Sequence, residues 1–117
     1  MLRTAVVIDE RYEDHDTGYG HPERAERVAA LRDLVESLGG AGLIRLEPRP
    51  ATHEEIALVH DEEHLKLVAS TAGGGPAAFD ADTPVSSGSY ETALLASGGL
   101  LALVDAIVAG DVDNGFA

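Results

Sequence analysis

The chain has 117 residues, of which 21 are Asp or Glu and 8 are Lys or Arg, so its formal net charge at pH 7 is -13. This charge repels phosphates and anionic lipid surfaces, and we therefore expect neither nucleic acid nor a membrane as partner. The lack of cysteine excludes disulfides and thiolate metal sites. We expect one domain over residues 1–117 and a cytoplasmic location, since the first residues resemble neither a signal peptide nor a membrane span.

The first half of the sequence predicts a strand, a helix and a second strand. Residues 4–8 are a short apolar run, typical of a strand buried on both faces. We expect Pro22 at the first position of a helix that ends at Gly39 and Gly40. Residues 43–46 form the next apolar run, and this order of elements favours a parallel sheet. The helix is predicted by apolar residues at helical spacing, namely Val28, Leu31, Val35 and Leu38.

Two short helices are predicted in the middle of the chain. Thr52 and Glu55 have the spacing of a capping box, so a helix begins there. We expect this helix to turn Ile56 and Val59 inward. Asp61 is placed to cap the helix that follows.

The last helix is apolar on nearly all sides. Ser87 or Ser89 is expected to cap its beginning, and Gly110 is expected to end it. The pair Gly98–Gly99 in its middle predicts a close contact with another backbone. Residues 114–117 predict a turn that leads into a further strand. Because so few strands cannot cover this helix or complete a parallel sheet, we expect a truncated domain.

Residues 77–88 predict a loop, because they show no helical period and carry Asp80, Asp82 and several hydroxyl groups. The two aspartates invite a cation site, yet they lack the spacing of a calcium loop. For Asp80 and Asp82 the sequence favours neither turn formation nor a functional role over the other.

The loop before the first long helix carries His15, Asp16 and His21, which are residue types that bind metals or move protons. The alternative has Asp16 bonding to turn amides and His21 standing at the helix entrance, and local sequence favours it. Arg24 and Arg27 lie three residues apart on the helix, where an arginine usually pairs with a nearby glutamate.

Residues 60–64 match the His-x-x-Glu-His pattern of one class of zinc metalloproteases. That chemistry needs a continuous helix through both histidines, but Asp61 is expected to start a new helix between them. Exposed histidines at a helix junction are the favoured interpretation.

Four motifs in order resemble one family: residues 15–18 (His-Asp-Thr-Gly), 20–27 (Gly-His-Pro-Glu-Arg-Ala-Glu-Arg), 59–61 (Val-His-Asp) and 80–91. This combination resembles the zinc-dependent histone deacetylase superfamily, and most of all its bacterial and archaeal class II-like members, which include acetylpolyamine amidohydrolases and acetoin utilisation proteins. The resemblance implies an α/β fold: the N-terminal part of an arginase-like and deacetylase-like three-layer architecture with a parallel sheet, here incomplete over residues 1–117.

The resemblance also implies a role for this segment in binding an acetylated amine or acetyl-lysine. Asp82 matches a carboxylate that holds substrate at the rim of a narrow tunnel, and His21 matches a rim position that contacts substrate in some relatives. Arg27 matches the arginine of an internal cavity that helps acetate leave, so a buried Arg27 without a nearby acid would indicate an anion port. The family's paired histidines, zinc ligands and tyrosine come later in the sequence. We therefore expect zinc in the full-length parent, and neither catalytic nor metal-binding residues in this segment.

A second interpretation remains open, in which the segment is a non-catalytic acidic module for binding or assembly. It would bury the last helix and the open sheet edge against a partner or against a second copy of itself, which leaves a homo-oligomer open as well.

Overall fold

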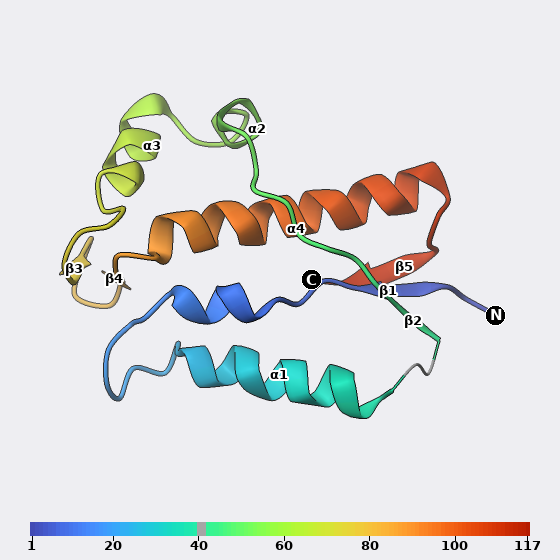
Figure 1. The fold of residues 1–117 in the computed structure, drawn as a ribbon. Helices are drawn as coiled ribbons and strands as arrows, with labels where there is room; N and C mark the ends of the chain where they lie inside the picture. Colours follow the sequence, from blue (N-terminus) through green and yellow to red (C-terminus); the bar gives the residue numbers. More distant parts are fainter. Residues whose placement is uncertain (40–41) are drawn as a thin grey trace.

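The computed structural model describes residues 1–39 and 42–117, and its sheet is formed by three parallel strands (Figure 1). They are β1 (Thr4–Val6), β2 (Leu43–Arg45) and β5 (Asn114–Phe116), in the order β2-β1-β5. The central β1 pairs Ala5 with Ile44 on one side and with Gly115 on the other. Both predicted parallel strands and the third strand at the end of the chain are thus confirmed.

The first long helix, α1 (Ala25–Ser37), begins three residues later than expected. Arg24 is its N-cap and has an extended backbone, so Pro22 lies in the bend before the helix and not at its first position. The predicted end at Gly39 is confirmed, whereas Gly40 lies outside the described residues. A 3-10 helix that the sequence did not predict, η1 (Glu10–Asp14), runs between α1 and α4 (Figure 1).

The two short helices are α2 (His53–Ala57) and α3 (Glu62–Ala69), and both predicted caps are confirmed. Thr52 and Glu55 form a complete capping box at α2. Asp61 accepts a hydrogen bond from the backbone N–H of His64 at α3. The inward placement of Val59 was wrong, because α2 ends at Ala57 and Val59 falls in the turn after it, 83% exposed.

The prediction of a loop without secondary structure over residues 77–88 was wrong. They contain a small antiparallel hairpin of β3 (Ala77–Ala78) and β4 (Pro84–Val85). The turn is held by a hydrogen bond from the Phe79 N–H to the Thr83 carbonyl, 3.0 Å long. Strands of two residues are too short to show the alternation of apolar and polar residues that predicts a strand.

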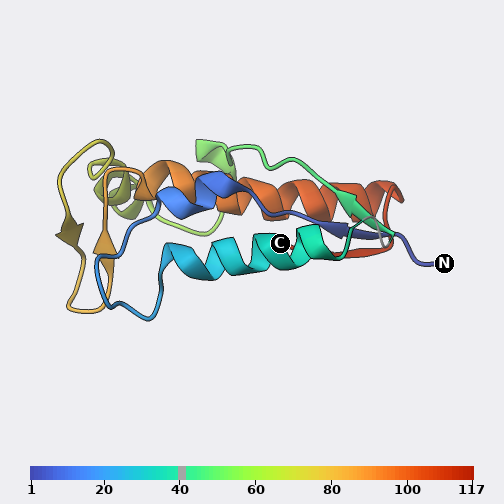
Figure 2. The ribbon, with the colours of Figure 1, turned by 60° about the horizontal axis from the view of Figure 1, so that its bottom comes forward.

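The longest helix, α4 (Ser89–Ala109), crosses the molecule from the hairpin to the sheet (Figures 1 and 2). The predicted close contact at its glycine pair is confirmed: a Cβ at Gly98 would overlap the backbone around Arg49, and one at Gly99 would lie 2.9 Å from a methyl of Val7. The predicted serine cap was wrong. Gly88 is the N-cap and has no side chain to make a cap bond, while Ser89 is the first helical residue and its hydroxyl bonds to His15.

Part of α4 packs in the core and part of it faces outward. Leu103 joins Ala5, Val7 and Val112 in a buried apolar cluster against the sheet. In contrast, Val108 is 82% exposed. Within residues 1–39 and 42–117, α4 is the one helix long and apolar enough to cross a membrane, a test based on length and composition that the core helix of a soluble protein also passes.

Candidate functional site

Two loops meet at the end of the molecule opposite the sheet (Figures 1 and 2). We call them the rim loops. The first, residues 15–24, connects η1 to α1, and the second, residues 79–89, runs from β3 through β4 to the start of α4. The three residues that sequence analysis assigned to substrate or product, His21, Asp82 and Arg27, lie on or directly after these loops.

Hydrogen bonds to two serines hold the rim loops together. The Asp16 N–H donates to Ser86 Oγ over 3.0 Å, and Ser86 Oγ in turn donates to the Asp14 carbonyl over 3.3 Å. His15 Nδ1 lies 2.7 Å from Ser89 Oγ. The backbones also approach closely, because a Cβ at Gly88 would lie 2.6 Å from the Asp14 carbonyl oxygen. The junction is therefore built from backbone and short polar side chains.

His21 and Asp82 face each other across the two rim loops, with His21 Nε2 3.3 Å from Asp82 Oδ1. The Glu23 N–H donates to His21 Nδ1 over 3.1 Å, while the buried Nε2 makes no hydrogen bond within the described part of the chain. Only 18% of the His21 side chain is exposed, compared with 91% of the Asp82 side chain. Asp82 thus lies beside the imidazole without a hydrogen bond to it and remains open to a ligand.

Asp80 shapes the turn that presents Asp82. Its Oδ1 accepts hydrogen bonds from the Thr83 hydroxyl, over 2.7 Å, and from the Asp82 N–H, over 2.8 Å. These bonds, the one from Thr83 first, lower the pKa of Asp80. For Asp80 the structure therefore supports turn formation.

The cluster of His15, Asp16 and His21 is not a metal site. Asp16 accepts from the Gly18 N–H over 2.8 Å, as the turn interpretation predicts, while His15 faces Ser89 and His21 faces Asp82. Across residues 1–39 and 42–117, no three His, Asp or Glu side chains are grouped so that they could hold a metal ion.

The second histidine motif does not form a metal site either. Asp61 caps α3, so the helix break predicted between the two histidines is confirmed. The rings of His60 and His64 stack with their centroids 4.8 Å apart. Both histidines are exposed, as the favoured interpretation held.

A cavity of about 620 Å³ lies beside the first rim loop, between α1, α4 and the hairpin. Most of its wall is apolar, and its polar lining comes from Tyr12, His15, Glu23, Arg24, Arg27, Ser89 and Thr92. Burial raises the pKa of Tyr12, which keeps this phenol neutral. A mostly apolar cavity with a few polar groups at one end is typical of a small-molecule site.

Arg27 lines this cavity, but its side chain is exposed in the described chain and not enclosed. No carboxylate of the described residues lies within 4.0 Å of its guanidinium, whereas Arg3, Arg11, Arg32 and Arg49 each have such a partner. Arg27 therefore has the free positive charge expected of an anion port without the expected burial.

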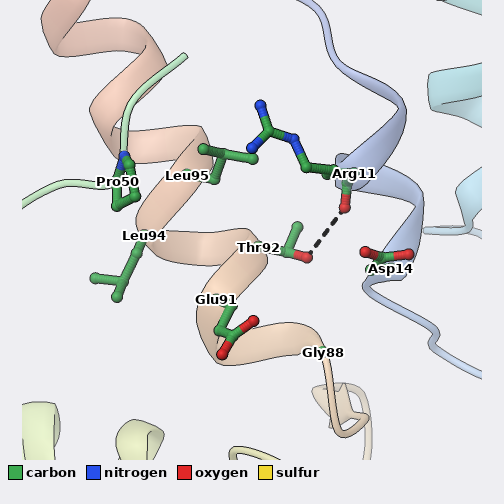
Figure 3. A pocket seen from close by; sticks show the side chains of 8 residues that line it. All are labelled: Arg11, Asp14, Pro50, Gly88, Glu91, Thr92, Leu94 and Leu95. Carbon is green, nitrogen blue, oxygen red and sulfur yellow. Dashed lines mark hydrogen bonds between the residues drawn. The ribbon is translucent and has the colours of Figure 1, made fainter.

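A smaller cavity of about 290 Å³ lies where η1 meets the first turns of α4 (Figure 3). Arg11, Asp14 and Glu91 line it, and the Thr92 hydroxyl donates to the Arg11 carbonyl over 3.3 Å. The guanidinium of Arg11 pairs with Asp9 at 2.8 Å. None of the residues predicted to bind substrate or product lines this cavity.

The structural roles of Ser86 and Ser89 were not predicted from the sequence. Both serines lie within the motif at residues 80–91 that carried the family resemblance. Their partners, Asp14, His15 and Asp16, are more than 65 residues away along the chain, with separations of 72, 74 and 70. No local pattern links residues at such distances, so only the shared membership of those motifs could have pointed to these contacts.

Comparison with known proteins gives consistent matches. The family model described as histone deacetylase domain matches residues 21–117. A probable deacetylase of Archaeoglobus fulgidus is 35% identical over 118 residues, which cover 97% of this chain and 32% of that protein. The polyamine deacetylase HDAC10 of Homo sapiens is 37% identical over 103 residues, which cover 81% of this chain and 15% of that protein.

A solved structure matches the fold as well. The crystal structure of the HDA15 HD domain superposes with a TM-score of 0.84 at 35% identity, over 97% of this chain and 34% of that chain. The predicted deacetylase-like α/β fold is thereby confirmed. This chain spans about a third or less of the length of the proteins it matches. By sequence and by fold, it belongs to the histone deacetylase domain family.

Proposed function

We propose that this chain is the amino-terminal segment of a zinc-dependent deacetylase that removes N-acetyl groups from acetyl-lysine, acetylpolyamine or a related acylated amine. The segment supplies the tunnel rim and part of the internal cavity, while the reactive centre is not among its residues. The observation that carries this proposal is the approach of His21 to the exposed carboxylate of Asp82, on the same two loops whose His15, Glu23 and Ser89 line a cavity of about 620 Å³.

The proposed roles follow from the chemistry of three side chains. The carboxylate of Asp82 accepts hydrogen bonds from substrate N–H groups, and the imidazole of His21 lies beside it at 3.3 Å. The guanidinium of Arg27, which has no acidic partner among the described residues, attracts the acetate product. A cationic polyamine would also be drawn to the acidic chain, whose net charge is -13.

The described residues do not fit a catalytic zinc ion. In residues 1–39 and 42–117 no three potential ligands come together, and a catalytic zinc site needs three protein ligands. No step of the reaction is therefore assigned to a metal held by this segment. Its contribution is to bind, orient and release.

The test uses the continuous reading frame that contains residues 1–117, expressed with zinc and assayed with an acetyl-lysine peptide and with N-acetylputrescine. We expect the protein encoded by the whole reading frame to hydrolyse at least one of the two substrates. Residues 1–117 alone should hydrolyse neither. If the encoded protein is folded and hydrolyses neither substrate, the enzymatic proposal is overturned. Hydrolysis by residues 1–117 alone would overturn the placement of the reactive centre elsewhere.

The outward face of α4 favours one second candidate function, a binding or assembly module. Leu100, Val104 and Val108 are 53%, 45% and 82% exposed, which is unusual for three apolar residues of one helix. Size-exclusion chromatography and an apolar dye separate the two candidates. A compact dimer of residues 1–117 that leaves the dye dark would support the module, and dye-binding aggregates would support a segment of a larger domain.

A further inference from the structure

A chain of polar contacts runs from the second rim loop through His15 to Glu23. The Ser86 N–H donates to Ser89 Oγ over 2.8 Å, and Ser89 Oγ lies 2.7 Å from His15 Nδ1. The Ser89 hydroxyl can accept from His15 Nδ1 or donate to it, and Ser86 Oγ lies 3.2 Å away as a further partner. The other ring nitrogen of His15, Nε2, faces Glu23 Oε1 at 3.8 Å.

The two ends of this contact differ in how firmly they are held. Ser89 is 7% exposed and begins α4, a helix of 21 residues whose Leu95 and Leu103 are buried. The first rim loop turns instead on Gly18 and Gly20, which have φ values of 85° and 80°. A Cβ at either glycine would meet no atom within 4 Å, so this part of the loop has little packing around it. Ser89 is therefore the fixed point and His15 the attachment of the loop.

Within the first rim loop, two hydrogen bonds at Glu23 connect the segment after His15 with His21. The Thr17 hydroxyl donates to the Glu23 carbonyl, and the Glu23 N–H donates to His21 Nδ1 over 3.1 Å. Thr17 is buried, unlike most of its neighbours. The imidazole of His21 is thus joined to the position of His15 through two hydrogen bonds at Glu23.

From these contacts we infer that His15, held by Ser89, is a positioning residue of the rim: it fixes the first rim loop so that the imidazole of His21 stays beside Asp82, whose carboxylate binds the substrate. This inference rests on the proposed function of Asp82. It assigns His15 no contact with substrate. The expected consequence is a change in substrate binding with little change in the chemical step.

The kinetic test compares H15A, S89A and H15N in the continuous reading frame, with S87A as the matched control. Ser87 is exposed, and none of the described side chains bonds to its hydroxyl. We expect H15A and S89A to raise KM by about tenfold with kcat within about twofold, as the loss of one oriented polar contact does. H15N should restore most of the affinity, because its amide can accept from Ser89 near the place of Nδ1.

A KM that stays at the wild-type value in both H15A and S89A would overturn the inference, and so would a fall in kcat alone. H15A alters no residue of α4, so it answers the question even where S89A disturbs the start of that helix. Circular dichroism of each variant shows whether its fold is retained.

A second readout does not depend on activity. The ring nitrogens of His15 and His21 are followed by ¹⁵N NMR, with H53A as control, since His53 makes a similar contact with Glu62, 2.6 Å long, far from the rim. We expect S89A to shift the signals of both His15 and His21. Unchanged His21 signals in S89A would contradict the positioning role. If the wild-type protein hydrolyses neither substrate while S89A still shifts the His21 signals, the proposed function is contradicted and the positioning role of His15 is not.

Discussion

His21 Nε2 lies 3.3 Å from Asp82 Oδ1, and this contact joins two loops that are far apart in the sequence. The imidazole is 18% exposed and the carboxylate 91% exposed. The histidine is thus the fixed partner, and the aspartate keeps a free oxygen for a ligand. This asymmetry is what a rim needs, because a carboxylate enclosed on all sides could not accept hydrogen bonds from a substrate.

The variant D82N tests this role most directly. We expect its KM for an acetyl-lysine peptide to rise about tenfold with a nearly unchanged kcat, because a charge-assisted hydrogen bond to substrate is lost while the reactive centre is untouched. Steady-state kinetics on the continuous reading frame measures both values. D33N is the control, since Asp33 is exposed on α1 and away from the rim. An equal change in D33N and D82N would show a general effect of charge.

The glycine pair of α4 gives a prediction about stability. In G98A the new Cβ would lie 2.6 Å from the Ala51 nitrogen and 2.7 Å from the Arg49 carbonyl carbon, so the backbone must move. We expect a loss of about 3 kcal/mol in the free energy of unfolding, at the upper end of the usual cost of overpacking. Urea denaturation followed by circular dichroism measures it. G75A is the matched control, because a Cβ at Gly75 meets no atom within 4 Å.

Local signals predicted the beginnings of α2 and α3, where one residue acts on its near neighbours. The capping box of Thr52 and Glu55 and the cap at Asp61 depend on contacts over three residues, and both were predicted correctly. The pair Gly98–Gly99 also has a local signature, because two glycines inside a helix are costly unless another backbone needs the space. The hairpin of β3 and β4 has none, since its strands are only two residues long.

The candidate site was predictable only through the family motifs. They predicted that His21 and Asp82 belong to one rim, which stays a prediction, and the structure brings the two side chains within 3.3 Å of each other. Ser89 shows why local reasoning fails here: serine before a helix predicts a cap, yet its hydroxyl bonds to His15 across the rim. The exposure of Arg27 could not be predicted from local sequence either, because the burial of a residue depends on every segment that packs around it.

The histidines at the junction of α2 and α3 give a prediction about metal. We expect a zinc titration of residues 1–117 by calorimetry to show no tight site, and the double variant H60A/H64A to give the same result. The reason is that the stacked rings of His60 and His64 do not converge on one point and no third ligand joins them among the described residues. Tight binding by the wild type that disappears in the double variant would show a zinc site at this junction.

Glu55 gives a prediction about pH, because its carboxylate joins α2 to the segment before it. Arg49 donates to both of its oxygens, over 2.7 and 2.8 Å, and the Thr52 N–H donates to Oε1 over 2.9 Å. These bonds, those from Arg49 first, lower the pKa of Glu55 from 4.5 to about 2. Its contribution to stability is therefore complete above about pH 4.5 and is lost as the pH falls toward 2.

The variant E55Q cannot ionise, so the difference in stability between wild type and E55Q isolates this contribution. We expect wild type to be the more stable at pH 7, with an equal difference at pH 5 and a smaller one at pH 2.5, measured by urea denaturation at each pH. E54Q is the matched control, because it removes a carboxylate from the same turn of α2 without touching Arg49. A difference in stability between wild type and E55Q that stays constant down to pH 2.5 would contradict the lowered pKa. A carboxyl group whose pKa is lower in the folded state than in the unfolded state must make the protein less stable as the pH falls through that range.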